Sequence, residues 1–115
     1  MRSNVFAFVL VAVALTGCSR GPVISVTNRS AITVSNAVVS GPSFSQPIGT
    51  LASGAERRVT VHPRGESDVR LTFEANGQKI DSGAMEYFED NSSYRVSLTV
   101  GADLKVTSST SIRPY

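Results

Sequence analysis

The sequence predicts an all-β domain in which seven or eight short antiparallel strands form two packed sheets. Apolar and polar residues alternate with a period of two through much of residues 23–107, as in strands with one buried and one solvated face. Turn-forming residues interrupt these runs at spacings of about 8–12 residues, which is typical of β-sandwiches and barrels. No segment of the domain shows a sustained helical period. A small barrel is the alternative arrangement of the same strands.

The first half of the domain contains three expected strands, each closed by residues that favour turns. Asn28-Arg29-Ser30 turns the chain after the first, Gly41-Pro42 interrupts the second, and Ser53-Gly54 closes the third. The expected strands cover residues 23–27, 32–39 and 48–51.

The second half contains the clearest strand signals. Residues 59–61 form a strand that ends at Pro63, and residues 69–73 alternate cleanly before Asn76-Gly77. That dipeptide predicts a tight hairpin because both central positions of its turn need positive φ. The return strand is expected to run from Ile80 towards Tyr87. A polar turn at residues 89–93 then leads into the regular alternation of residues 94–100, and residues 104–106 close the set after a turn at 101–103.

Two sheets built from these strands resemble the immunoglobulin or fibronectin type III architecture. The resemblance is one of architecture alone, because the chain has a single cysteine and no tryptophan, and so lacks the cysteine pair and core tryptophan of immunoglobulin domains. We expect one domain at residues 23–107 and a flexible, Ser- and Thr-rich tail at residues 108–115.

Residues 1–17 have the features of an export signal. Arg2 gives a positive start, and the eleven residues from Val5 to Leu15 are all apolar. As a helix this run would be about 16 Å long at roughly 1.5 Å per residue, whereas the hydrocarbon core of a bilayer is about 30 Å thick. The run therefore fits a cleaved signal helix better than a membrane span.

The signal ends in Leu15-Thr16-Gly17-Cys18, which resembles the lipobox of bacterial lipoproteins. The resemblance implies that Leu15, Thr16 and Gly17 are recognised by the signal peptidase and that Cys18 carries a diacylglycerol thioether after cleavage. Such cysteines usually gain a further acyl chain, and two or three chains on one residue give an essentially permanent membrane anchor. The alternatives are a plain secretory leader or a short buried helix.

Residues 18–22 are then the lipidated N-terminus and a short linker, so the domain should lie close to the lipid surface. In enteric-type lipoproteins Asp after the cysteine resembles an inner-membrane retention signal. Ser19 stands there instead, which favours the periplasmic face of the outer membrane over the inner membrane.

Composition argues against several functions. The net charge of +2 gives no clustered basic surface for nucleic acid. His62 is the only histidine, so we expect an exposed turn residue and neither a catalytic triad nor a zinc site. We therefore expect no enzyme activity, no metal and no cofactor other than the lipid on Cys18. Four arginines, Arg57, Arg58, Arg64 and Arg70, are ordinary solvated residues or contacts to anionic lipid head groups.

One loop is the first candidate for contact with a partner. Tyr87, Phe88, Glu89 and Asp90 place two aromatic residues beside carboxylates, a combination that can supply an interaction hot spot. Glu86 adds a further carboxylate, but the spacing of a calcium loop is absent. The alternative is a solvated hairpin loop whose aromatic residues belong to the core. We expect an envelope lipoprotein that docks an unknown protein partner, with an envelope glycan- or ligand-binding module as the alternative.

Overall fold

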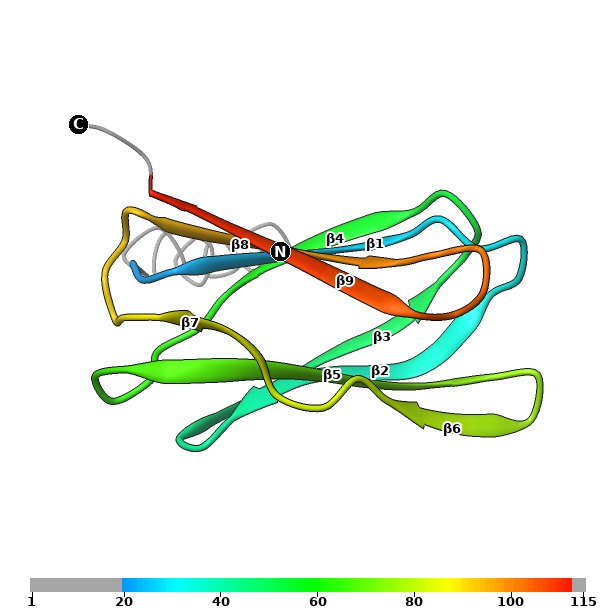
Figure 1. Cartoon of the computed structure of the whole chain (residues 1–115), viewed down its shortest axis with the longest axis horizontal. Helices are drawn as coiled ribbons and strands as arrows, with labels where there is room; N and C mark the ends of the chain where they lie inside the picture. The colour runs from blue at the N-terminus through cyan, green and yellow to red at the C-terminus, as the bar shows by residue number, and fades with distance from the viewer. Residues whose placement is uncertain (1–19, 113–115) are drawn as a thin grey trace, which may run out of the picture.

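The computed structural model describes residues 20–112, which form a β-sandwich (Figure 1). The all-β sandwich expected from the sequence is confirmed, and the described residues contain nine strands, one more than the upper expectation. The expected leader and lipobox, with Cys18, lie outside the described residues. No helix long and apolar enough to cross a membrane occurs within residues 20–112. The strands are β1 (Val23–Asn28), β2 (Val34–Gly41), β3 (Phe44–Leu51), β4 (Glu56–Thr60), β5 (Ser67–Ala75), β6 (Gln78–Asp81), β7 (Met85–Phe88), β8 (Tyr94–Val100) and β9 (Val106–Ile112).

The first sheet has the strand order β4-β1-β8-β9, and the second has the order β3-β2-β5-β6 with β7 also paired to β5. All neighbours are antiparallel except β1 and β8, which are parallel and pair Ile24 with Val96 and Val26 with Leu98. The antiparallel pairing expected from the sequence therefore holds for every other pair of strands but not for this one. Alternation shows which face of a strand is buried but carries no information about the direction of its neighbour.

The core lies between the two inner faces. Every second residue of β5, and of β8 from Val96 onward, is buried there, as the period of two requires. Sixteen apolar residues make up the buried cluster: Ile24, Val26, Val34, Ala37, Val39, Ile48, Leu51, Val61, Val69, Leu71, Phe73, Ala75, Phe88, Val96, Leu98 and Val100.

The Asn76-Gly77 hairpin is confirmed, with φ of 52° at Asn76 and 72° at Gly77. Its return strand, however, is broken into β6 and β7. At the break the Ser82 N–H donates to the Leu71 carbonyl (2.9 Å) and Ser82 Oγ accepts from the Leu71 N–H (3.0 Å). Gly83 adopts a φ of 77°. A side-chain hydroxyl thus replaces one ladder acceptor, so the expected continuous strand from Ile80 to Tyr87 does not form.

The C-terminal residues also differ from expectation. The segment 108–112, expected to begin a flexible tail, belongs to β9 and pairs antiparallel with β8 from Val106 to Ile112. Ser and Thr at this end lower the apolar content but do not prevent strand pairing. The hydroxyls of Ser108 and Thr110 donate hydrogen bonds to the Glu86 carboxylate of β7. Residues 113–115 of the expected tail lie outside the described part of the chain.

Asn28, at the end of β1, is a fully buried polar hub. Its Nδ2 donates to the carbonyls of Ile32 (2.8 Å) and Leu51 (3.0 Å). Its Oδ1 accepts from the N–H (3.0 Å) and the hydroxyl (2.7 Å) of Ser30. Four hydrogen bonds therefore tie the end of the first sheet to the β1–β2 loop and to the end of β3 in the second.

Replacing Asn28 with Asp keeps the shape but removes both donors and sets a carboxylate against two carbonyls. We expect a loss of about 3 kcal/mol in the free energy of unfolding, because buried polar groups without partners are costly. Urea denaturation followed by circular dichroism measures this loss. Asn91→Asp is the matched control, because Asn91 Oδ1 only accepts, from the Ser93 N–H (2.8 Å), and Asp keeps that role. Equal losses in the free energy of unfolding for the two variants would contradict this role of Asn28.

Candidate functional site

The aromatic pair of the candidate loop is divided between the surface and the core. Tyr87 is 54% exposed, whereas Phe88 is completely buried. The Phe88 ring meets Phe44 edge-on, with centroids 6.0 Å apart and planes at 73°. The prediction of Phe88 as a contact residue is therefore wrong, because consecutive strand residues point to opposite faces and the inner one is taken up by the core.

Tyr87 stands among carboxylates on the outer face of the second sheet. It pairs across the strands with Asp68 of β5, and Glu66 and Glu89 lie close enough to act on its titration. A hydrogen bond with Glu66, with burial and the charges of Glu66 and Glu89 adding to it, raises the pKa of Tyr87 to about 12. The phenol therefore stays neutral at neutral pH. We call Tyr87 and the three surrounding carboxylates, Glu66, Asp68 and Glu89, the tyrosine face. It presents an aromatic ring surrounded by negatively charged groups. Asp90 is exposed in the adjoining loop.

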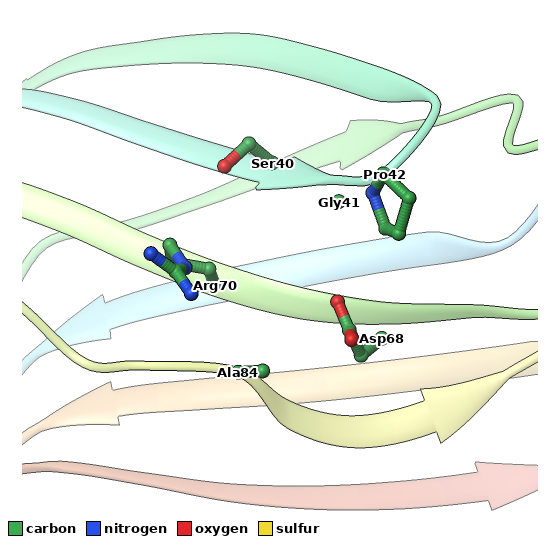
Figure 2. A pocket seen from close by; sticks show the side chains of 6 residues that line it. All are labelled: Ser40, Gly41, Pro42, Asp68, Arg70 and Ala84. Carbon is green, nitrogen blue, oxygen red and sulfur yellow. The ribbon is translucent and has the colours of Figure 1, made fainter.

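A hollow of about 380 Å³ shares Asp68 with the tyrosine face. Figure 2 shows the six residues that line it. Ser40 of β2 and Arg70 of β5 are paired in register and both line it. The Arg70 guanidinium is held by Asp81 at 3.1 Å. The remaining lining residues are Gly41, Pro42 and Ala84. The hollow therefore offers a hydroxyl, a carboxylate and a guanidinium within one small area.

Gly41 allows β2 and β5 to approach each other closely beside the hollow. A Cβ at this position would come within 2.6 Å of the Asp68 carbonyl and of Ser67 Oγ. No larger residue fits without moving backbone, so the close approach of β2 to β5 under the hollow depends on glycine. The sequence showed Gly41-Pro42 only as a break between strands.

Glu86 turns away from the candidate loop and bridges the two sheets. Ser108 Oγ donates to its Oε2 (2.8 Å) and Thr110 Oγ1 to its Oε1 (2.6 Å). Its backbone has a φ of 34°, a value that residues other than glycine rarely adopt. These hydrogen bonds, that from Thr110 most, lower the pKa of Glu86. No local motif identifies the contact, because its partners lie more than twenty residues along the chain.

The four arginines singled out in the sequence are dispersed. Arg57 Nη1 donates to the Ile48 carbonyl of β3 at 2.6 Å and so bridges the sheets on the side opposite Glu86. Arg58 pairs with Glu56 on the outer face of the first sheet, and Arg70 lies on the outer face of the second. Arg64 is exposed in the connection from β4 to β5. They do not form a single basic patch.

His62 lies at the end of the sandwich where the chain enters β1. It is exposed, and its ring packs near the backbone of Gly21, where an added Cβ would come within 3.2 Å of Nδ1. Within residues 20–112 no three His, Cys, Asp or Glu side chains come together as they would around a metal ion.

A solved structure with a similar fold is an NMR structure of a protein from Eubacterium rectale. The two chains are 19% identical with a TM-score of 0.52, and the match covers 79% of this chain and 88% of the other. This likeness shows a shared fold alone. No protein-family model matches the chain, and no curated protein is significantly similar to it.

The Glu86 bridge makes stability depend on pH. Because folding lowers the pKa of Glu86 below its usual 4.5, the bridge stabilises the fold fully above that pH and is lost as the pH falls through the lower, folded-state value. We expect Glu86→Gln to destabilise the protein at neutral pH, and the difference from wild type to shrink in acid. Urea denaturation over a pH series measures it.

A double-mutant cycle provides the control. In a Thr110→Val background the strongest donor to Glu86 is gone, so Glu86→Gln should cost less there than in the wild type. Additive effects of the two substitutions, or a difference that does not change with pH, would show that the bridge contributes nothing to stability.

Proposed function

We propose that this protein is a non-enzymatic lipoprotein of the bacterial cell envelope, anchored through lipid on Cys18, that docks a protein partner through the tyrosine face. The proposed site of action is the periplasmic face of the outer membrane, on the basis of Ser19. The observation that carries the docking proposal is the exposed Tyr87 ring surrounded by Glu66, Asp68 and Glu89.

The way the chain enters β1 supports a close anchor. The Pro22 carbonyl accepts from the Val61 N–H at 3.1 Å, and Gly21 is buried against Val61 and His62. Gly21 is the third residue after Cys18, a reach of at most about 11 Å at roughly 3.5 Å per residue. A lipid on Cys18 would therefore keep this end of the sandwich, where β1 begins and the β4–β5 and β7–β8 connections lie (Figure 1), near the membrane.

The chemistry of the tyrosine face indicates the kind of partner. Tyrosine offers a large apolar ring and a hydroxyl at little entropic cost, and such residues dominate binding energy at protein interfaces. The surrounding carboxylates would attract a basic segment and speed its association. We therefore propose a partner with exposed Lys or Arg beside an apolar contact.

The hollow beside this face supports a second candidate function. Ser40, Asp68 and Arg70 can donate and accept several hydrogen bonds, which suits a polar ligand such as an envelope glycan. This candidate uses the same face of the second sheet, so one experiment addresses both.

The anchor is tested by the intact mass of protein isolated from the membrane fraction, wild type beside Cys18→Ala. We expect a mass equal to the chain from Cys18 plus two or three acyl groups in the wild type. The variant should lack the acyl mass and leave the membrane. An unmodified wild-type chain in the soluble fraction would overturn the lipoprotein assignment.

Docking through the tyrosine face is tested by replacing Ala84 with a photo-crosslinking amino acid, because Ala84 is exposed at the edge of the hollow. In living cells we expect a discrete protein adduct that Tyr87→Ala reduces by about tenfold or more, as for a hot-spot residue. Ile112→Ala is the matched control, because Ile112 is also an exposed large apolar residue, at 63%, on the other sheet. An adduct of glycan mass would favour the second candidate. An adduct equally strong in both variants would exclude the tyrosine face.

A further inference from the structure

We infer that the outer face of the first sheet is a second binding surface, one that docks onto the phosphate groups of anionic membrane lipids. Its proposed orientation rests on the anchor at Cys18, whereas its binding chemistry depends only on residues of the described domain. The tyrosine face contributes no residue to this surface.

Strand register aligns arginine and hydroxyl side chains in rows across this face. Arg58, Ser25, Ser97 and Ser109 stand side by side on β4, β1, β8 and β9. In the next row Val23 separates Thr60 from Arg95. Since every second residue of a strand points to the same side, the rows place guanidinium and hydroxyl donors together on one face.

Two guanidinium groups border a hollow of about 260 Å³ in this surface. Arg58 and Arg95 line it together with Ser25 and Ser97, whose hydroxyls are 3.4 Å apart. Arg95 Nη1 donates to the carbonyls of Ser92 (2.8 Å) and Tyr94 (3.2 Å), which orients its guanidinium. Arginine guanidinium groups and hydroxyls donate the hydrogen bonds that phosphate oxygens accept.

The charge of this face suits an anionic surface. Arg58 is 74% exposed along its side chain, and its Nε contacts Glu56 at 3.0 Å. Surface pairs of this kind are weak, so a phosphate can compete for the guanidinium. The tyrosine face on the other sheet carries Glu66, Asp68 and Glu89, which would be repelled by anionic lipids.

The path of the chain selects lipid as the occupant. Val23 lines the hollow and is the first residue of β1, and it follows Cys18 by five residues, a reach of at most about 18 Å. Arg20, exposed in the same connection, adds a third positive charge on the way to the anchor. Basic residues this close to a membrane surface each strengthen binding to anionic lipid.

The test uses the chain from residue 18 onward with Cys18→Ala, which retains all nine described strands and the entire core. Its sedimentation is measured with phosphatidylcholine vesicles with and without phosphatidylglycerol. We expect binding only to the anionic vesicles, weakened by raised salt. Arg58→Gln with Arg95→Gln should reduce the partition coefficient about 25-fold, or roughly fivefold for each arginine.

The control variant Arg29→Gln with Lys105→Gln removes the same charge from the opposite end of the sandwich and should reduce binding less than about threefold. Thermal denaturation checks that both variants fold. Three results would each overturn the inference. They are equal losses of vesicle binding in the two double variants, no vesicle binding by the unsubstituted protein, and binding of inorganic phosphate without binding of vesicles. If the protein does not bind the anionic vesicles although Cys18 is acylated in cells, this surface alone is rejected. If it binds the vesicles although Cys18 is unmodified, the anchor alone is rejected.

Discussion

Burial of apolar side chains between the two sheets is the interaction on which the rest of the structure depends. With one cysteine in 115 residues, the chain cannot form a disulfide within itself, so the core and the contacts around its rim hold the sheets together. Arg57 bridges them on one side, Glu86 on the other, and Asn28 at one end. Among the described residues every buried side-chain nitrogen and oxygen has a hydrogen-bond partner, as a stable interior requires.

Because the core uses only the inner half of each strand, the two outer faces are left to differ. The first sheet presents hydroxyls and two arginines, while the second presents Tyr87 among carboxylates. The arginine and hydroxyl face is built on paired strands, and the tyrosine face has Tyr87 and Asp68 on paired strands with Glu66 and Glu89 in the adjoining connections, so these strand side chains are held at fixed spacings. Rigid placement of this kind lowers the entropy lost on binding and suits a domain that recognises other molecules.

The fold class, the approximate positions of most strands and the Asn76-Gly77 hairpin could be predicted because they depend on local pattern. What the sequence could not supply depends on distant partners. The parallel pairing of β1 with β8 and the contacts of Glu86 join residues far apart in the chain. Adjacent aromatic residues, Tyr87 and Phe88, gave no indication of which one the core would take. The break at Ser82 was hidden because its hydroxyl substitutes for a ladder partner.

The proposed lipid anchor and the two proposed binding faces fit one arrangement. If lipid on Cys18 anchors the chain, a tether as short as residues 18–20 would keep the domain at the membrane surface, and either face would work close to lipid. If the arginine and hydroxyl face meets the head groups, the tyrosine face on the opposite sheet points away from them and stays open to a protein. The reverse orientation would press Glu66, Asp68 and Glu89 against anionic phosphates, which like-charge repulsion disfavours. Under these two proposals, the charge difference between the sheets would let a lipid surface and a protein partner bind together without competing for one face.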